Sequence, residues 1–244
     1  MSEKPSRKIP PLMVLLWLIM TTAGILGSLY VVPWLMPDVA SNTMHLSVLT
    51  MVIFSVAAAP VAGLVYAVLV YGIVRWRYQG QGVPPDGPPL RANSPVTSVW
   101  LVGSTVLTIF LLVWGLALLA NDQGGEASAE MSVDVTGQQW VWSFAYPGTQ
   151  VKSHELYVPV DTEVSFRVTS EDVVHGFWIP QMGIKINANP GVFTSAAVMP
   201  NKIGTYDIRC TEICGLNHAV MVTRVHVLSK TDFQQWLTQQ PASI

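Results

Sequence analysis

Apolar residues gather into three long runs in the first half of the chain. None of these runs contains Asp, Glu, Lys or Arg, and each reaches the roughly 20 residues that span the hydrocarbon of a bilayer. The pattern therefore predicts membrane-spanning helices from Pro11 to Met36, from Leu46 to Val74 and from Val96 to Ala120. Pro60, inside the second run, is expected to kink that helix or to mark a packing contact.

Beyond Asn121 apolar and polar residues alternate, for example from Val151 to Val158 and from Thr162 to Val168. Alternation with period 2, interrupted by Pro, Gly and Asn, indicates antiparallel strands in a sandwich or barrel. We expect four parts: residues 1–43 with the first apolar segment, 44–122 with a helical hairpin and a basic loop, 123–230 as an all-β domain, and 231–244 as a C-terminal helix or tail.

The first apolar run has two interpretations. A basic start, an apolar stretch and Thr21-Thr22-Ala23 are also typical of a secretory signal with a small-residue cleavage site. Apolar residues continue past Ala23 to Trp34, however, which is longer than a signal core of about 7 to 15 residues. We expect a retained helix; the alternative, cleavage, leaves two helices.

Basic residues mark one side of the expected membrane. They are Lys4, Arg7 and Lys8 before the first run, and Arg75, Arg77 and Arg91 between the second and third. The short link around Asp38 has no basic residue. Because basic flanks favour the cytoplasm, we expect a multi-pass protein of an inner or plasma membrane with its β half on the periplasmic or outer side.

Composition supports a membrane protein and excludes one class of partner. Hydrophobic residues make up 50% of the 244 residues and charged residues 11%, against about 25% charged in soluble domains. A net charge of −2 excludes a protein built to neutralise nucleic-acid phosphates. No ionisable carboxylate or amine lies within the apolar runs, so the helices are expected to anchor the chain in lipid and to pack against a larger membrane partner rather than to conduct protons.

The residues with distinctive chemistry lie near the end of the β half. Residues 210–221, CTEICGLNHAVM, contain both cysteines, Cys210 and Cys214, together with His218 and Met221. Thiolates, imidazole and thioether form a soft ligand set that suits copper better than calcium or magnesium. Zinc stays open, although it more usually takes four Cys or His ligands. Since one loop cannot close such a site on all sides, a further imidazole is expected, and His175 is the candidate.

Two alternatives to a copper site remain. A disulfide between Cys210 and Cys214 would suit an oxidising compartment, but it would close a tiny loop with little entropic stabilisation. A thiol-redox or copper-delivery protein is expected on a βαβ pattern, which the β half lacks. The other histidines, His45, His154 and His226, are expected to be surface or hydrogen-bonded residues.

The loop resembles the binuclear copper A loop of subunit II of haem-copper cytochrome c oxidases, and the resemblance covers most of the chain from about Leu46 onward. It includes the paired helices, the basic loop, the aromatic segment GQQWVWSF from Gly137 to Phe144, the His175 segment, Lys185 and Pro190-Gly191. The resemblance implies an α-helical transmembrane anchor of two or three helices and an all-β, cupredoxin-like Greek-key barrel outside the membrane.

The resemblance also implies the ligands. Cys210 and Cys214 would bridge two copper ions through their thiolates. The remaining ligands would be His175 and Met221 on one copper, and His218 and the backbone carbonyl of Glu212 on the other. The side chain of Glu212 would bind a magnesium ion shared with subunit I, which suits a carboxylate.

Aromatic and acidic residues near the site are candidates for contact with an electron donor. Trp140 resembles the family's electron-entry tryptophan. Ordinary packing is the alternative, since Trp140 and Trp142, two apart on a strand, would share one face. Trp142 is expected to be structural. Glu171 and Asp172 resemble docking acids for a basic cytochrome face.

The chain also departs from the family. Thr97 stands where an acidic residue usually contributes to a proton-path entrance, and Asn187 and Ala145 stand where relatives often have acids. The first apolar run has no counterpart in the common two-helix form. These departures weaken the expected docking patch, so the donor is expected not to be a typical, strongly basic cytochrome c.

Together these features predict subunit II of a respiratory cytochrome c oxidase, the electron-entry subunit of an oxidoreductase. Its copper A centre would take electrons from a cytochrome c or a small copper protein and relay them to haem in subunit I, where oxygen is reduced to water. The alternatives are the copper A subunit of a nitric oxide reductase, which nothing in the chain separates from it, and a copper-delivery protein. A quinol oxidase subunit keeps the fold but lacks these copper ligands.

Overall fold

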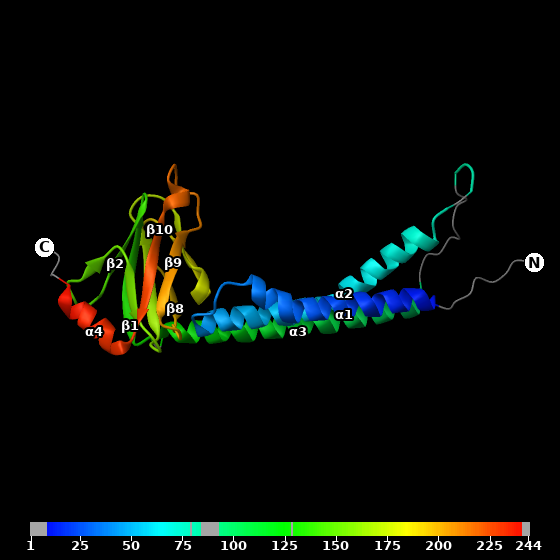
Figure 1. Ribbon diagram of the computed structural model, residues 1–244, viewed down its shortest axis with the longest axis horizontal. Helices are drawn as coiled ribbons and strands as arrows, with labels where there is room; N and C mark the ends of the chain where they lie inside the picture. Colours follow the sequence, from blue (N-terminus) through cyan, green and yellow to red (C-terminus); the bar gives the residue numbers. More distant parts are fainter. Residues whose placement is uncertain (1–8, 79, 84–92, 128, 241–244) are drawn as a thin grey trace, which may run out of the picture. The chain divides into compact units, whose positions relative to one another are not determined.

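The computed structural model describes residues 9–78, 80–83, 93–127 and 129–240, apart from the side chains of residues 121–127. The chain divides into two units, one comprising Met1–Met36 and Thr50–Gly115, the other Pro37–Leu49 and Leu116–Ile244. Figure 1 labels the helices and several of the strands along the chain. Four of the basic residues that indicated the orientation lie outside the described residues: Lys4, Arg7, Lys8 and Arg91.

Three long apolar helices confirm the three expected spans. They are α1 (Pro11–Leu35), α2 (Asn42–Arg75) and α3 (Ser94–Ala127). Each contains a stretch long and apolar enough to cross a membrane. A proline at the first helical position starts α1, where a missing N–H is harmless, and Pro37 follows its end, where it cannot continue the helix.

Helices α1 and α2 approach closely through small residues. A Cβ added to Gly63 would lie 2.6 Å from Oγ1 of Thr21, so only glycine fits there without a shift. On the same interface the indole Nε1 of Trp17 donates a hydrogen bond of 2.9 Å to the carbonyl oxygen of Pro60. Pro60 therefore marks a packing contact, which was one of the two expectations for it.

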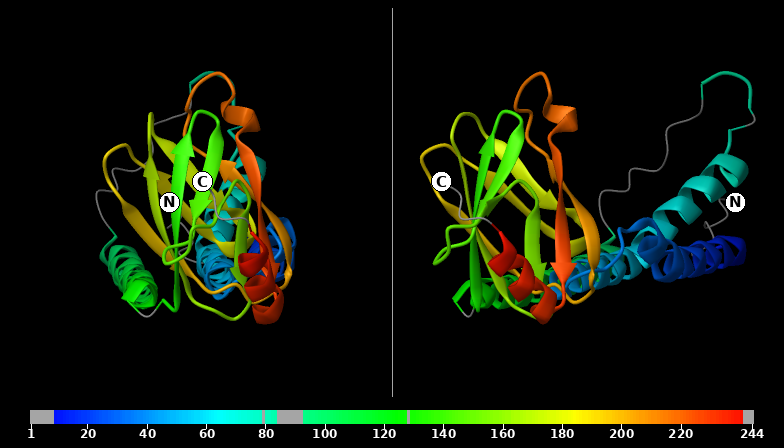
Figure 2. Two further views of the ribbon diagram at one scale, coloured as in Figure 1. Left: turned by 90° about the vertical axis from the view of Figure 1, so that its left-hand side faces the viewer. Right: turned by 60° about the vertical axis from the view of Figure 1, so that its left-hand side comes forward.

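The described residues of the second unit form ten strands in two sheets of five. The first sheet has the order β3-β2-β1-β5-β8 and the second β4-β10-β9-β6-β7. The strands are β1 (Met131–Gln138), β2 (Val141–Ala145), β3 (Lys152–Ser153), β4 (Leu156–Pro159), β5 (Val164–Ser170), β6 (His175–Ile179), β7 (Ile184–Ala188), β8 (Thr194–Val198), β9 (Gly204–Cys210) and β10 (Val222–Leu228). Two views of the sheets are given in Figure 2.

Alternation of side chains builds the core between the sheets. In β5, Val164, Phe166 and Val168 are fully buried while Arg167 points outward, as the period-2 pattern predicts. Phe166 packs on Phe177 of β6 in the other sheet, with ring centroids 5.5 Å apart. The expected combination of apolar helices long enough to span a membrane with an all-β domain is thus confirmed.

Two details add to or differ from the expected strands. Residues 151–158, an example of the alternation that predicted strands, form β3 and β4 in different sheets, because the chain turns where the hydroxyl of Ser153 accepts a hydrogen bond from the N–H of Glu155. In addition, β1 runs parallel to β5 and β4 parallel to β10, since the chain changes sheets between these partners instead of forming hairpins. All other strand pairs are antiparallel.

Residues between α1 and α2 are held by the β unit. Ala40 donates its N–H to the carbonyl of Gln181 at 2.8 Å and accepts from the N–H of Asn201 at 3.0 Å. The hydroxyl of Ser41 donates to the carbonyl of Met182 at 2.7 Å. Ala40 and Ser41 are completely buried, so this short link is a structural part of the β unit.

The chain ends in a short amphipathic helix, α4 (Lys230–Gln239). Ser229 caps it by accepting a hydrogen bond from the N–H of Asp232 at 3.1 Å. Trp236 stacks on Tyr157 of β4 with ring centroids 4.1 Å apart. Figures 1 and 2 show α4 toward one end of the strands and the loop between β9 and β10 at the other.

Candidate metal centre

Both cysteines lie where β9 ends and its following loop begins. Cys210 is the last residue of β9, and Cys214 lies on the loop that leads to β10. Their Sγ atoms are 3.7 Å apart and both thiols are free. Because a disulfide holds its sulfur atoms about 2.05 Å apart, the structure contains no bond between these two residues.

Strand β6 brings His175 to the same loop. It pairs antiparallel with β9, with Phe177 opposite Cys210, so the first residue of β6 lies beside the start of the loop. The buried His175 directs Nδ1 at Sγ of Cys210, 3.9 Å away. Among the described residues, His175, Cys210 and Cys214 are the one group of three His, Cys, Asp or Glu side chains whose ligand atoms lie within 4.8 Å of one another.

Three further donors from the loop approach the sulfur atoms. The carbonyl oxygen of Glu212 lies 3.3 Å from Sγ of Cys210. The short 3-10 turn η2 (His218–Val220) and the residue after it bring Nδ1 of His218 to 3.6 Å and Sδ of Met221 to 3.8 Å from Sγ of Cys214. Each cysteine sulfur therefore has one imidazole nitrogen and one further donor close to it.

These separations and donor types fit metal binding. Ligand atoms around one tetrahedral ion stand about 3.3 to 3.8 Å apart, given metal–ligand distances of about 2.0 to 2.3 Å for imidazole and thiolate. The donor contacts in this loop span 3.3 to 3.9 Å. Sulfur and imidazole donors select soft ions such as copper. Two central sulfur atoms with one imidazole each match a pair of ions that share the sulfurs.

The loop is closed by its own backbone. The N–H of Cys210 bonds to the carbonyl of Met221 at 3.1 Å, and the N–H of Thr211 bonds to the carbonyl of Gly176 at 3.1 Å. A Cβ on Gly176 would overlap the hydroxyl of Thr211, so glycine is required for this approach. These contacts join the loop to β6 and hold its donors in place without a bound ion.

The thiol of Cys214 resists ionisation in this setting. Burial raises the pKa of Cys214 to about 11, and the hydrogen bond with Cys210 and the charge of Cys210 raise it further. At neutral pH Cys214 therefore keeps its proton unless a cation displaces it. Since metal ions bind thiolates rather than thiols, loading the site must release protons.

The other nitrogen of His175 meets a carboxylate. Nε2 lies 2.8 Å from Oδ1 of Asp172. On the remaining sides the ring contacts the edge of Trp142, with centroids 5.9 Å apart, and the backbone at Gly137, where an added Cβ would lie 3.0 Å from Cδ2 of His175. Asp172, Trp142 and Gly137 therefore hold the imidazole in place while its Nδ1 faces the cysteines.

Asp172 is engaged through both carboxylate oxygens. Oδ2 accepts from the N–H of Gln139 at 2.7 Å, and Oδ1 accepts from the N–H of Val173 at 2.6 Å and from the hydroxyl of Ser170 at 3.2 Å. Burial raises the pKa of this carboxyl, but the hydrogen bonds and the neighbouring His175 outweigh it and lower the pKa to about 2. Of the two expected docking acids, Glu171 is the exposed one.

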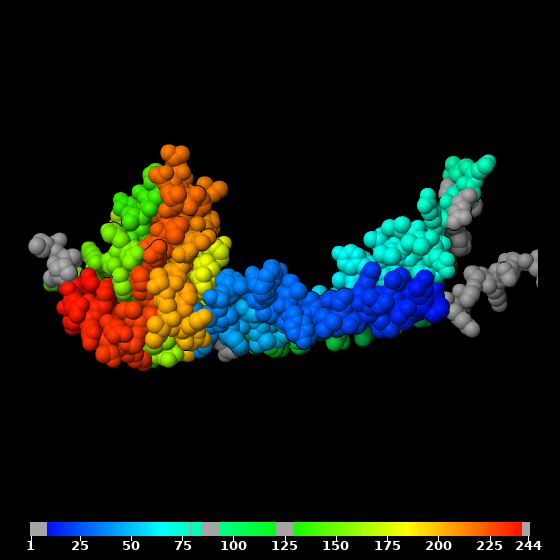
Figure 3. Space-filling model, viewed as in Figure 1, coloured from blue at the N-terminus to red at the C-terminus, as the bar shows by residue number. Residues whose placement is uncertain are grey.

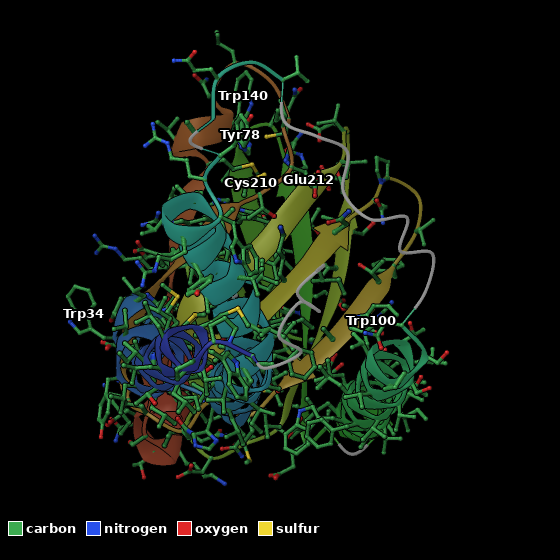
Figure 4. The ribbon with its side chains drawn as sticks, turned by 90° about the vertical axis from the view of Figure 1, so that its right-hand side faces the viewer. Trp34, Tyr78, Trp100, Trp140, Cys210 and Glu212 are labelled. Carbon is green, nitrogen blue, oxygen red and sulfur yellow. The ribbon has the colours of Figure 1, made fainter. Side chains whose placement is uncertain are left out.

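Trp140 lies in the turn between β1 and β2, not on a strand beside Trp142 as the packing alternative assumed. Its indole lies against the metal loop, since a Cβ on Gly215, whose φ is +119°, would be 3.3 Å from the ring. Trp142, by contrast, is buried in the core against Phe177, with centroids 5.5 Å apart. In Figure 4, Trp140, Cys210 and Glu212 lie at the same end of the β unit.

Sequence reasoning missed Gln139 as a site residue. Its side-chain amide donates to the carbonyl of Cys214 at 2.6 Å, and its backbone N–H donates to Asp172. Its place beside Trp140 in the aromatic segment was the available signal, but nothing in the spacing indicates which loop it contacts. Gly137 was noticed only as part of the aromatic segment and Asp172 only as a docking acid, and their contacts with His175 emerge from the fold.

The remaining candidates fall outside the cluster. No carboxylate or histidine among the described residues joins the side chain of Glu212 in a metal-binding group, so the magnesium expectation has no support. His154 bonds through Nδ1 to the carbonyl of Trp142 at 3.0 Å, and His226 through Nε2 to Glu155 at 2.9 Å. His45 is exposed. These three histidines therefore have the surface or hydrogen-bonded roles expected of them.

The tip of the metal loop is apolar and exposed. Ile213 is 90% exposed, Leu216 92% and Val220 72%. In Figure 3 the loop projects as orange surface at the upper end of the β unit. Exposed apolar side chains gathered beside a candidate metal site are typical of a contact surface.

Comparison with known proteins gives consistent matches. A family model described as the periplasmic domain of cytochrome c oxidase subunit II matches residues 149–228, a stretch that contains all six clustered donors. The cytochrome c oxidase subunit 2 of Thermostichus vulcanus is 28% identical over 231 residues, covering 73% of this chain and 70% of the relative.

Other relatives are more similar in sequence. The heme-copper oxidase subunit 2 of Aeropyrum pernix is 32% identical over 196 residues, covering 74% of this chain and 84% of the relative. The cytochrome c oxidase subunit 2 of Candida albicans is 31% identical over 182 residues, covering 64% and 69%. Among solved structures, the periplasmic domain of subunit II of cytochrome oxidase of Bradyrhizobium japonicum is 30% identical, covers 46% of this chain and 93% of that chain, and has a TM-score of 0.44.

Proposed function

Since this chain belongs to the cytochrome c oxidase subunit II family, we propose that it is the electron-entry subunit of a respiratory oxidase. It takes electrons one at a time from a cytochrome c or a small copper protein. The residues of its donor cluster would hold a binuclear copper A centre, through which electrons would pass to haem in subunit I, where oxygen is reduced to water.

The observation that carries this proposal is the symmetry of the donor cluster. Two free sulfur atoms lie 3.7 Å apart, each with an imidazole nitrogen within 3.9 Å. His175 and Met221 would complete one copper, and His218 and the carbonyl of Glu212 the other. When bound, two copper ions that share two thiolates supply a centre that gains and loses one electron with little change in geometry.

The chain's own residues keep the donors from reorganising. His175 is confined by Asp172, Gly137 and Trp142, and the loop is tied to β6 by the bond from Thr211 to Gly176. A rigid ligand shell suits electron transfer because little energy is needed to adjust it between oxidation states. Burial of His175 and of Cys214 also keeps water away from the ligand atoms.

Trp140 is the proposed point of electron entry. Its ring lies against the metal loop at Gly215, and Gln139, its neighbour in the chain, bonds to the carbonyl of Cys214. A donor that touches Trp140 would therefore be one side chain away from a cysteine ligand. The exposed Leu216 beside Gly215 supplies apolar contact area, and the exposed Glu171 supplies a charge that attracts a basic donor.

The apolar helices anchor this domain in an inner or plasma membrane. Their side chains are largely exposed, which suits contact with lipid and with the haem-bearing subunit I. The basic residue Arg75 ends α2 and Arg77 follows it, and they indicate the cytoplasmic side, so the β domain lies on the periplasmic or outer side.

The proposal is tested on the intact membrane complex that contains this chain. Reduced cytochrome c and a reduced small copper protein are supplied as donors, and oxygen uptake and nitric oxide consumption are measured. We expect donor-dependent oxygen uptake that is lost in the Cys214→Ser complex. Nitric oxide consumption without oxygen uptake would instead identify a nitric oxide reductase. Full activity of the Cys214→Ser complex would show that the activity does not need copper A.

A further inference from the structure

We propose that Asp172 is a positioning residue that selects the tautomer of the His175 ligand. Through Gln139, Asp172 also fixes the Trp140 turn to the same ligand shell. The inference rests on the proposed copper A function and deepens it. Asp172 was expected to dock the electron donor, whereas this inference gives it a role next to the metal ligand His175.

The first step is the hydrogen bond between Asp172 and His175. A carboxylate without a proton can only accept, so the 2.8 Å contact requires the proton of the imidazole on Nε2. Nδ1 is then left with its lone pair, and it is this nitrogen that faces Sγ of Cys210. A metal-binding histidine commonly donates its other N–H to a carboxylate, which makes the ligating nitrogen more basic.

Packing alone cannot make this selection. Gly137 and the edge of Trp142 confine the ring of His175 from the sides, and they fix where the ring lies. Neither contact supplies a hydrogen-bond acceptor to Nε2. The position of the ring and the position of its proton therefore have separate causes, and the two can be separated by experiment.

The second step runs from Asp172 to the turn that carries Trp140. The other carboxylate oxygen accepts the backbone N–H of Gln139 at 2.7 Å, and the side chain of Gln139 donates to the carbonyl of Cys214 at 2.6 Å. Gln139 thus bridges the His175 side of the cluster and the cysteine loop. Since Trp140 is the next residue, its place against the loop depends on the same two bonds.

Glu171 offers a matched control. It neighbours Asp172 and carries the same charge, but it is exposed, whereas Asp172 is the carboxylate bonded to His175. An effect of surface charge would appear in both Glu171→Gln and Asp172→Asn. An effect through the ligand would appear in Asp172→Asn alone.

The test uses the full chain in detergent, loaded with copper, as wild type, Asp172→Asn, Glu171→Gln and Gln139→Ala. Copper affinity, reduction potential and the electron paramagnetic resonance spectrum are measured for each. Nitrogen NMR of labelled histidine in the metal-free chain reports which nitrogen of His175 carries the proton, and circular dichroism reports folding.

We expect Asp172→Asn to fold, to bind copper about 10- to 100-fold more weakly, and to have a raised reduction potential and an altered His175 protonation. Glu171→Gln should match wild type in copper affinity, potential and histidine protonation. Gln139→Ala should keep the His175 protonation and the two-copper spectrum but oxidise a reduced donor more slowly.

Wild-type affinity, potential and histidine protonation in a folded Asp172→Asn chain would overturn the inference. An equal shift in Glu171→Gln would overturn it as well. If Asp172→Asn does not fold, an unchanged donor rate and Trp140 fluorescence in Gln139→Ala would overturn the second step, and a slower rate would support it. Failure of the wild-type chain to bind two copper ions would instead reject the proposed function, and this inference with it.

Discussion

Cys210 and Cys214 hold their Sγ atoms 3.7 Å apart, too far for a disulfide and close enough to share the same metal ions. Each sulfur also has its own imidazole neighbour, His175 for Cys210 and His218 for Cys214. The centre therefore depends on both sulfurs at once.

Replacing one sulfur should destroy the shared site. We expect Cys214→Ser to abolish the mixed-valence copper spectrum, because a hydroxyl is a poor ligand for a soft ion and cannot bridge as a thiolate does. Thr211→Val in the same loop is the control, since the hydroxyl of Thr211 is buried without a hydrogen-bond partner in the described part of the chain. A normal spectrum from Cys214→Ser would reject the ligand assignment.

The two tryptophans near the site should behave differently. Trp140→Ala is expected to leave copper bound but to slow oxidation of a reduced donor by orders of magnitude in rapid-mixing experiments, because the ring is the proposed entry path. Trp142→Ala is expected to destabilise the domain by about 3 to 5 kcal/mol in thermal or denaturant unfolding, because that ring fills the core. Unchanged turnover in Trp140→Ala would show that Trp140 only packs and is not the point of electron entry.

A single methyl group at position 137 should disturb His175. Its Cβ would lie 3.0 Å from Cδ2 of His175 and 3.1 Å from the ring of Trp142. We expect Gly137→Ala to destabilise the domain by about 1 to 3 kcal/mol and to weaken copper binding, measured by unfolding and by copper titration. A variant with wild-type stability and copper affinity would show that His175 is not confined from this side.

The donor surface combines an apolar and a charged contribution. Leu216→Ala is expected to weaken donor binding without changing its dependence on salt, because Leu216 offers only apolar area. Glu171→Gln is expected to lower the association rate and to flatten its dependence on salt, since exposed charges act mainly on encounter. Stopped-flow rates at several ionic strengths separate the two. The same salt dependence in Glu171→Gln and wild type would exclude Glu171 from docking.

Helix α1 is expected to remain in the mature protein. Trp17 donates to the carbonyl of Pro60, and Thr21 lies against Gly63, so α1 is a packing partner of α2. The intact mass of the chain isolated from membranes should therefore include residues 11–35. A mass that corresponds to cleavage near Ala23 would show that the helix is removed.

The helices and much of the site were predictable because each rests on a local signal. Charge-free runs of sufficient length predicted α1, α2 and α3, and the spacing of Cys210, Cys214, His218 and Met221 on one loop indicated a soft metal site. These features depend on residues that are close together in the chain, so the sequence predicts them without knowledge of the fold.

The contacts that cross the fold could not be predicted. Asp172 meets His175 only because the turn before β6 folds back, and Gln139 reaches Cys214 across 75 positions of sequence. The division of residues 151–158 between two sheets depends in the same way on a local turn and on the partners of β3 and β4. Alternation indicates that a stretch is extended, but it does not say which strands pair.

The most direct test of the account is the electron paramagnetic resonance spectrum of the copper-loaded full chain, recorded together with copper per protein. The account predicts a seven-line signal at two copper ions per chain, the pattern of one electron shared by two nuclei. A four-line signal at one copper ion, or a Cys210–Cys214 disulfide with no copper bound, would contradict it.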